Sequence, residues 1–231
     1  GGQPVLLQLL RHEELAGDMQ LVVLGVAGEF NDFHAVAQGI RDGIEQVLFC
    51  MYKSEEHDTI PIKCPTIILD IRSLMELSTA LKILKISKYL KRNHIDIVQT
   101  YFFDSMCLGV LSGRLACVKR IISCRRDMGF WYTKKHLFFL KLSNVIVNRI
   151  LVNSNSVKEN VVRFEKVVPE KIDVIRNGLQ VASFRDVSSC RNKSRKDLSI
   201  DIDEVCIGLI ANMSRSVKRV DLLIESARII L

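Results

Sequence analysis

Two parts of the sequence carry residue types that could bind a diphosphate. Arg215 and Lys218 lie in a polar turn, residues 211–221, which leads into a helical pattern. Cationic side chains there would add to the positive end of a helix dipole, an arrangement that suits phosphate groups. Gly1 and Gly2 lead into another apolar helical pattern, and paired glycines let a backbone approach a phosphate or a sugar closely. A solvated turn is the alternative for the first part, and an expression remnant is the alternative for the second.

A third candidate lies where an apolar segment ends and a helical pattern begins. Tyr101 ends the segment, and Asp104 follows three residues later. Parallel α/β sheets bind ligands at the carboxyl ends of their strands, so both residues are candidates for a binding site. The alternative for Asp104 is a plain helix N-cap, a position that favours aspartate.

The fourth candidate, residues 124–131, follows another apolar segment. It combines Arg125, Arg126 and Asp127 with Trp131. Arginine forks bind carboxylate or phosphate groups, and an indole ring offers a stacking face. The alternative is a salt-bridged loop with the tryptophan in a core.

The seven cysteines are scattered and include no C-x-x-C pair. This spacing predicts neither a zinc site nor a disulfide framework, and it favours a reducing cytosol. Cys107, Cys124 and Cys206 lie among aliphatic residues, where we expect the thiols to pack as small hydrophobic groups. We therefore expect no metal site and no cofactor.

The composition is that of a folded protein with a basic surface. Hydrophobic residues make up 48% and charged residues 26% of the 231 residues, which excludes a disordered chain. The longest apolar stretches are far shorter than the roughly 20 residues that cross a bilayer. The formal net charge is +7, and residues 82–126 hold ten cationic side chains against two acidic ones. Such a face suits an anionic leaflet, so we expect a cytoplasmic protein in peripheral contact with the inner face of the cell membrane. A solvated helix face is the alternative.

Aliphatic runs of strand length alternate with helical patterns along the chain. The runs are residues 21–25, 66–70, 96–102, 120–124, 150–153, 171–175 and 205–210. The clearest helical pattern covers residues 73–92. Two capping boxes are expected at helix starts, Ser73 with Glu76 and Ser156 with Glu159. Because strands that alternate with helices need crossover connections, the sequence predicts a doubly wound parallel α/β sheet.

The composition changes after residue 180. Residues 181–204 are rich in serine, arginine, aspartate and lysine and have no apolar period, which is typical of a linker or a long surface loop. Residues 205–231 then give a new strand and a helix, but so short a segment cannot bury a core alone. We therefore divide the chain into a domain at 1–180, a linker at 181–204 and the start of a truncated second domain at 205–231.

Several of these segments, in this order, resemble the glycosyltransferases of family 4. Residues 96–101 resemble the family's D-I-V-H-x-H strand, with Tyr101 where many members have a histidine, and residues 150–154 resemble its I-x-V-N-S strand. Residues 171–184 are similar to its K-I-x-V-I-x-N-G signature, and residues 207–227 to the opening of its donor-binding domain. The resemblance implies the GT-B fold of two facing Rossmann-like domains. This chain would contain the acceptor-side domain and the first β-α unit of the second domain.

The resemblance also implies an activity, namely transfer of a sugar from a nucleotide-sugar donor to a saccharide or a lipid-linked acceptor. It further implies retention of anomeric configuration, a metal-independent mechanism and a fragment that is inactive alone. The residues implied at the donor diphosphate are Gly1, Gly2, Arg215 and Lys218. The residues implied on the acceptor side are Tyr101, Asp104, Arg125, Arg126 and Asp127. The catalytic residues are not identified.

Two other functions stay open. A basic α/β domain could bind nucleic acid or another anionic ligand without catalysis, although no RNP, KH or helix-turn-helix pattern supports nucleic acid as a partner. A sugar-nucleotide epimerase shares the two-domain architecture. Residues 150–154 and 171–184 favour the transferase.

Overall fold

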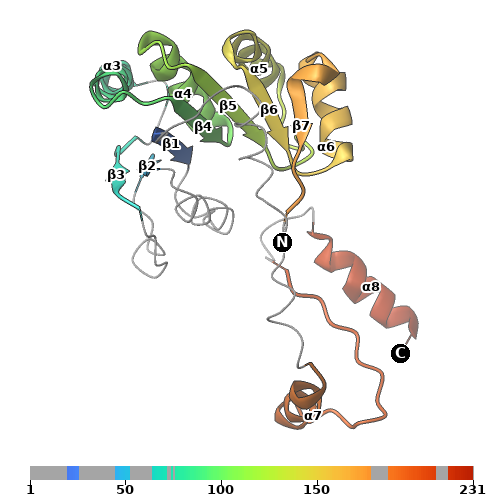
Figure 1. Cartoon of the computed structure of the whole chain (residues 1–231). Coiled ribbons are helices and arrows are strands. Elements are labelled where there is room, and N and C mark those ends of the chain that lie inside the picture. The colour runs from blue at the N-terminus through green and yellow to red at the C-terminus, as the bar shows by residue number, and fades with distance from the viewer. Residues whose placement is uncertain are drawn as a thin grey trace. The chain divides into compact units, whose positions relative to one another are not determined.

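A computed structural model of the chain describes residues 20–25, 45–52, 64–71, 74, 76–177, 187–211 and 218–230 (Figure 1). The chain divides into two units, residues 1–177 and residues 178–231. No helix in the described part of the chain is long and apolar enough to cross a membrane.

The first unit is built on one parallel sheet. Its strands are β1 (Gln20–Gly25), β2 (Glu45–Cys50), β3 (Thr66–Ile68), β4 (Ile97–Tyr101), β5 (Arg120–Arg125), β6 (Arg149–Val152) and β7 (Ile172–Val174). They lie in the order β3-β2-β1-β4-β5-β6-β7, and every neighbouring pair is parallel. The chain thus winds outward from β1 in one direction and from β4 in the other, so the prediction of a doubly wound, Rossmann-like α/β fold is confirmed.

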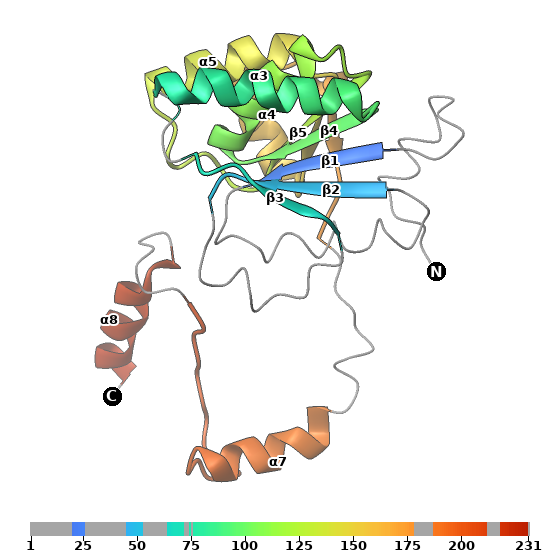
Figure 2. The same cartoon turned by 90° about the vertical axis from the view of Figure 1, so that its left-hand side faces the viewer.

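Three helices form a layer on one side of this sheet. They are α3 (Leu77–Arg92), α4 (Phe103–Leu115) and α5 (Lys134–Ile146), and α4 contacts both of its neighbours. Two views of the chain place all three on the same side of the strands (Figures 1 and 2). At Gly113 the middle helix packs so closely that an added Cβ would lie 3.1 Å from the Ile121 side chain of β5.

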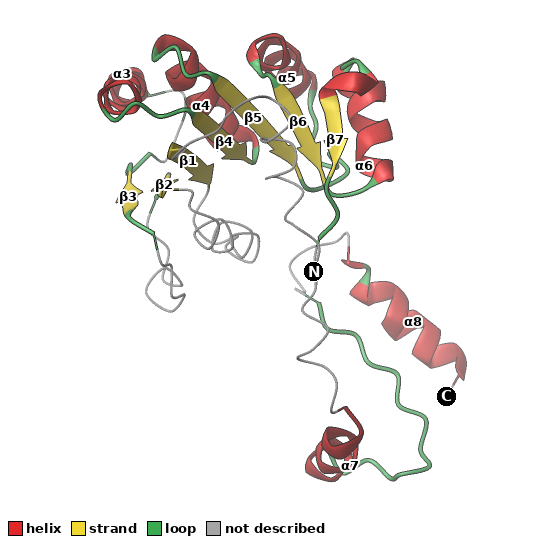
Figure 3. Cartoon of the chain, viewed as in Figure 1, coloured by secondary structure: helices red, strands yellow, loops and turns green. Residues whose placement is uncertain are grey.

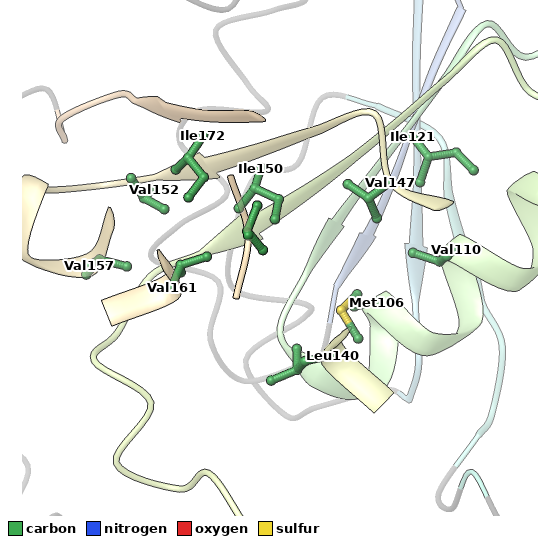
Figure 4. Close-up of a cluster of buried hydrophobic side chains, with 11 residues drawn as sticks. Met106, Val110, Ile121, Leu140, Val147, Ile150, Val152, Val157, Val161 and Ile172 are labelled. Atoms are coloured by element: carbon green, nitrogen blue, oxygen red, sulfur yellow. The ribbon is translucent and has the colours of Figure 1, made fainter. Parts of the chain in front are cut away.

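The core on this side consists of two clusters of hydrophobic side chains. One fills the space between α4, α5, β6 and the helix α6 (Asn155–Asn160) that follows β6, and it is shown in Figure 4. Its fully buried members include Leu140 and Ile150, which have no solvent-exposed surface. The other cluster packs α3 and α4 against β2 and β4 around Phe49 and Leu90. Central strands buried on both faces explain why aliphatic runs predicted most of them.

The helix starts differ from the predicted capping boxes. The helix α3 begins at Leu77 with Glu76 as its N-cap and no side-chain cap, and Ser73 lies outside the described residues. The helix α6 is capped by Ser154, whose hydroxyl accepts a hydrogen bond from the Val157 N–H at 3.2 Å. The box predicted at Ser156 is therefore wrong, whereas the box at Ser73 falls outside the described residues. In α6 the reason is that β6 ends at Val152, so the chain turns into the helix two residues earlier than the Ser156 pattern indicated.

The strand β2 was not predicted. Its first two residues, Glu45 and Gln46, are polar, so the segment lacks the continuous aliphatic run that marks the other strands. In the sheet Gln46 is nevertheless buried, and it pairs with Leu21 of the neighbouring strand β1.

In its described residues the second unit forms the helices α7 (Val187–Asp197) and α8 (Val220–Ile230), drawn in red in Figure 3. The prediction of a loop over residues 181–204 is wrong where α7 forms, while the role of that range as a linker between domains stays a prediction. The strand predicted over residues 205–210 is wrong too. Those residues are exposed, have no regular secondary structure and pair with no strand among the described residues. A strand needs a neighbour to satisfy its backbone groups.

Two of the three cysteines expected in the interior lie there. Cys124 is buried, and Cys107 packs against the cluster around Leu140. Burial raises the pKa of Cys107 to about 12, so its thiol stays protonated near neutral pH. Cys206 is exposed in the unpaired segment of the second unit, so the expectation that it packs as a hydrophobic group is wrong.

Candidate functional site

The carboxyl edge of the sheet brings together the acceptor-side residues predicted from the sequence. The strands β4 and β5 are neighbours, and they end at Tyr101 and Arg125. Asp104 follows β4, and Arg126 and Asp127 follow β5, so all five residues lie at or just beyond one edge. The edge is the position at which parallel α/β domains bind ligands.

Tyr101 is the last residue of β4, but its side chain points into the protein and not toward solvent. Its side chain is buried, and the phenol oxygen accepts a hydrogen bond from the Gln99 amide at 2.7 Å. The same amide lies 3.3 Å from the Cys124 sulfur of β5. The Tyr101 side chain therefore supports the two central strands from within.

Asp104 lies on the first turn of α4 and is exposed. It does not cap the helix, because the N-cap residue is Phe102. The backbone of Phe102 has φ 65° and ψ 164°, a combination that is essentially confined to glycine and costs about 1–3 kcal/mol in other residues. This turn sends the chain from β4 directly into α4, and strain of this kind gathers at functional sites.

The carboxyl group of Asp104 is held in a partly desolvated place. Desolvation raises its pKa above the usual value, and the positive character of His136 on α5 opposes that rise. No described residue forms an ion pair with Asp104. Its carboxylate is thus available to a ligand that brings its own hydrogen-bond donors.

Arg125 is the centre of a buried polar network. Its guanidinium makes two hydrogen bonds to Glu165, both of 2.9 Å, and a further one of 3.1 Å to the side-chain oxygen Oδ1 of Asn144. It also donates to the Ser123 hydroxyl at 2.5 Å. Glu165 in turn accepts hydrogen bonds from the Asn144 amide at 2.7 Å and from the Tyr132 hydroxyl at 2.6 Å. The network joins β5, α5 and the short π-helix Val161–Glu165.

Glu165 and Arg125 stay ionised in this network. Burial disfavours ionised Glu165, but the guanidinium of Arg125 and the hydrogen bonds outweigh it and hold the pKa of Glu165 below its usual range. Burial and the charge of Glu165 raise the pKa of Tyr132, so its hydroxyl remains a donor. The Arg125 side chain is committed to protein partners, in agreement with the salt-bridged alternative for this segment.

The loop after Arg125 is shaped by Asp127. Its carboxylate accepts a hydrogen bond from the Gly129 N–H at 2.7 Å and contacts the indole N–H of Trp131 at 3.0 and 3.1 Å. Gly129 has φ +65°, and a Cβ there would lie 2.5 Å from the Tyr132 ring. Only glycine fits this turn without strain, so the loop presents Trp131 in one defined orientation.

Trp131 is not in a core, because 37% of its surface is exposed. Its ring makes edge-to-face contacts with Phe103, Tyr132 and His136 at centroid distances of 5.8, 4.7 and 5.1 Å. An oriented and partly exposed indole is suited to stacking on a sugar ring.

The carboxyl end of β6 meets this loop through Asn153. Its side-chain amide donates to the Arg126 carbonyl at 2.9 Å. The other polar atom of this side chain, Oδ1, is buried and has no hydrogen-bond partner among the described residues. Arg126 itself is half-buried beside Asn153, and Asp127 beyond it is exposed.

The donor-side residues are largely outside the described part of the chain. Gly1, Gly2 and Arg215 fall there, and Lys218 is exposed in the second unit. Their assignment to a diphosphate stays a prediction. Within the described residues there is no group of three or more histidine, cysteine, aspartate or glutamate side chains that could hold a metal ion.

Sequence reasoning missed Glu165 and the role of Tyr132. Glu165 lies 40 residues from Arg125 and belongs to no recognisable motif, so nothing in the sequence paired them. The start of α5 was missed too: Thr133 and His136 form a reciprocal cap, which the usual pattern with glutamate or glutamine at the third position does not include.

Comparisons with known proteins agree with this fold. The protein-family model for Glycosyltransferase Family 4 matches residues 36–183. Comparison with curated protein sequences gives no match.

Solved structures show where the likeness lies. The chain is similar to HepE from Anabaena, crystallised with UDP and glucose, with a TM-score of 0.64 and 14% identity over 78% of this chain and 50% of that one. It is similar to a glycosyltransferase from Rickettsia africae ESF-5, with a TM-score of 0.67 and 16% identity over 81% and 51%. It also resembles the UDP-GlcNAc 2-epimerase from Methanocaldococcus jannaschii, with a TM-score of 0.54 and 15% identity over 80% and 54%.

At such identities the solved structures support the fold alone, and they include a glycosyltransferase as well as an epimerase. The chain spans about half the length of these structures. The family model, by contrast, covers well over half of the chain itself, including the carboxyl edge described above. The chain therefore belongs to glycosyltransferase family 4.

Proposed function

We propose that the chain supplies the acceptor-side half of a glycosyltransferase, which moves a sugar from a nucleotide-sugar donor to a saccharide or a lipid-linked acceptor. The family match over residues 36–183 carries this proposal. It is supported by the similar fold of HepE, which was crystallised with UDP and glucose.

The acceptor meets the carboxyl edge in this proposal. Asp104 and Asp127 supply carboxylates that accept hydrogen bonds from sugar hydroxyls, and Trp131 supplies a stacking face. Arg125 and Tyr101 act indirectly, since their side chains are engaged with Glu165 and Gln99.

In this proposal the cationic side chains of Arg215 and Lys218 bind the donor diphosphate. Gly1 and Gly2 stay candidates for the same ligand from the sequence alone. Negative charge develops on the leaving diphosphate in the transition state, and fixed cations and a helix N-terminus stabilise it. The reaction proceeds with retention and without a metal. The chain also contains two aspartates separated by one residue, Asp201 and Asp203, and carboxylates can bind a divalent cation. The metal independence of the reaction is therefore tested directly.

The chain by itself does not turn over, because transfer needs the other half of the donor site as well. The whole protein works in the cytoplasm, at the inner face of the membrane, where a lipid-linked acceptor would be found.

The test is release of nucleoside diphosphate by the full-length protein from a panel of nucleotide sugars, with and without added saccharide and lipid-linked acceptors. Arg215→Ala and Lys218→Ala should each weaken donor binding by about 1.5–3 kcal/mol, as the loss of a charged hydrogen bond does. Lys196→Ala, in the exposed face of α7, is the matched control and should leave donor affinity unchanged.

Three outcomes would contradict parts of the proposal. Unchanged donor affinity in both variants would remove the donor assignment. Conversion of the nucleotide sugar to its epimer without an acceptor would identify an epimerase instead. Loss of turnover in EDTA, with recovery on adding Mg²⁺ or Mn²⁺, would overturn the metal-independent mechanism.

A further inference from the structure

The outer face of α5 exposes a stripe of large apolar side chains. Phe138, Phe139, Leu142 and Val145 are 64%, 46%, 56% and 80% exposed. Their spacing of one, four and seven residues puts them on one side of the helix. The opposite side of α5 is the one that packs into the domain through Leu140. The stripe is therefore additional to the surface that folds the domain.

Aromatic rings extend this stripe onto the loop before α5. Phe130 is 74% exposed and Trp131 is partly exposed. Phe103 contacts both Trp131 and Phe139, at centroid distances of 5.8 and 6.5 Å, and Phe139 contacts Phe138 at 5.6 Å. Trp131, Phe103, Phe139 and Phe138 thus form one continuous row of rings. We call this row, the stripe on α5 and the neighbouring Phe130 the α5 surface.

Lysines accompany the apolar stripe of the α5 surface. At 100° per residue, Lys134 and Lys141 lie beyond Val145 at one edge of the stripe, and Lys135 lies within it, between Leu142 and Phe139. All three are exposed. No acidic residue occurs between Asp127 and Glu159 in the sequence, so the surface carries cations without a compensating charge on its own segment.

We propose that the α5 surface docks on the anionic face of a lipid bilayer. Bulky apolar side chains enter the headgroup boundary, while lysine stems follow them and keep their ammonium groups at the lipid phosphates. Each lysine near an anionic surface adds a favourable attraction. The proposal goes beyond sugar transfer, because docking needs neither donor nor acceptor.

Other occupants fit this surface less well. A nucleic acid would place its phosphates against phenylalanine and leucine side chains. A symmetric pair of chains would bring the same lysines face to face, since both copies present the same patch. A bilayer satisfies the apolar stripe and its lysines together.

The α5 surface differs from the basic face predicted over residues 82–126. Two cations of that range are engaged with carboxylates, Arg125 with Glu165 and Lys119 with Asp96. On α3, Leu81 and Leu84 are exposed among lysines. The helix α3 therefore offers a control of matched chemistry: two exposed leucines beside cations, but without the aromatic extension.

The experiment is flotation of the 231-residue chain with vesicles of phosphatidylcholine alone or with 30% phosphatidylglycerol. The chain should float with the anionic vesicles in about 0.1 M salt, where screening is modest, and less in 0.5 M salt. Phe138→Ser with Leu142→Ser should weaken binding at least tenfold, whereas Leu81→Ser with Leu84→Ser should change it less than twofold. Alanine at Lys134 or Lys135 should weaken anionic binding about fivefold for each lysine removed.

Several results would overturn the proposal. One is no binding of the wild-type chain to anionic vesicles, and another is equal binding to both vesicle types. A third is wild-type binding by the Phe138 and Leu142 variant with its circular dichroism unchanged. If that variant fails to fold, Phe130→Ser in the loop serves in its place, and the same outcomes apply. A dimer in sedimentation velocity that dissociates in the variant, without vesicle binding, would identify a second copy as the occupant and also overturn it.

Discussion

Two carboxylates near the carboxyl edge, Glu165 and Asp104, lie in opposite environments. Glu165 is buried and accepts hydrogen bonds from Arg125, Asn144 and Tyr132, which hold its pKa low. Asp104 is exposed, is paired with no cation among the described residues, and has its pKa raised by desolvation.

The difference separates a scaffold from a surface that a ligand can use. Every polar group of the Glu165 carboxylate is already satisfied, so it fixes the position of β5 and of the loop that follows. Asp104 and Asp127 lie on the outer side of that scaffold, with Trp131 between the loop and α5. Charged residues that are close in the sequence thus serve two purposes. The buried ones hold the scaffold together, and the exposed ones are accessible to a ligand.

The largest expected effect comes from breaking the scaffold. Glu165→Gln leaves the buried Arg125 guanidinium without its counter-charge, which costs about 3–5 kcal/mol of unfolding free energy. Urea unfolding followed by circular dichroism measures it. Glu159→Gln, on the exposed side of the adjacent helix α6, is the control and should change stability by less than about 0.5 kcal/mol.

The same pair predicts a pH dependence with a definite sign. The pKa of Glu165 is lower in the folded chain than in the unfolded chain, where it is about 4.3. Its contribution to stability is therefore complete above pH 4.3 and is lost as the pH falls through the folded pKa. The Glu165→Gln variant should lack this part of the acid dependence. An equal acid dependence in both proteins would mean that the ion pair does not form.

A smaller effect is expected from Gly129, which shapes the loop over the scaffold. An alanine there would hold φ at +65° and place its Cβ 2.5 Å from the Tyr132 ring, whose hydroxyl binds Glu165. We expect a loss of about 1–3 kcal/mol in unfolding free energy. Gly113→Ala is the matched control, because its nearest contact is a flexible isoleucine methyl at 3.1 Å and its φ is not positive. Equal effects of the two substitutions would show that strain at Gly129 is not what shapes the loop.

Much of the fold followed from the sequence, because a doubly wound sheet buries its central strands on both faces. The resulting aliphatic runs, such as residues 120–124, are visible without any contact information. Segments that do not combine an aliphatic run with burial were harder to predict. The polar start of β2 concealed a strand, and the exposed run at 205–210 looked like a strand although it pairs with nothing among the described residues.

In the candidate site, too, the features set by local sequence could be predicted, whereas those set by contacts between distant residues could not. Local spacing placed Tyr101, Asp104 and the Arg125 segment at one edge, since strand ends are a local property. The sequence did not show that Arg125 points inward, because its partner Glu165 is 40 residues away and comes from another element. Nor did it show the exposure of the α5 surface, since a phenylalanine at helical spacing normally predicts a core.

A smaller loss of stability is expected from substitution of Asp127, which lies on the exposed side of the scaffold. Asp127→Ala removes the acceptor for the Gly129 N–H and the Trp131 indole, which should cost about 1 kcal/mol. Asp127→Asn keeps one acceptor oxygen and should cost less. The fluorescence of the single tryptophan reports the change directly: its emission should shift to the red in the alanine variant as the indole becomes more exposed. An unchanged spectrum would show that Asp127 does not orient the ring.

The smallest effect, and one of opposite sign, is expected at Asp104. Its pKa is raised in the folded chain, so ionised Asp104 is less favourable there than in the unfolded chain, where the pKa is about 3.9. The penalty is absent well below pH 3.9, grows as the pH rises through the folded pKa, and is complete above it. Asp104→Asn should therefore equal the wild type at low pH and exceed it slightly at neutral pH, by less than about 0.5 kcal/mol because the residue is exposed. Urea unfolding at two pH values measures this difference in unfolding free energy.

A loss of stability of Asp104→Asn at neutral pH would mean that Asp104 has a favourable partner in the fold and belongs with Glu165 to the scaffold.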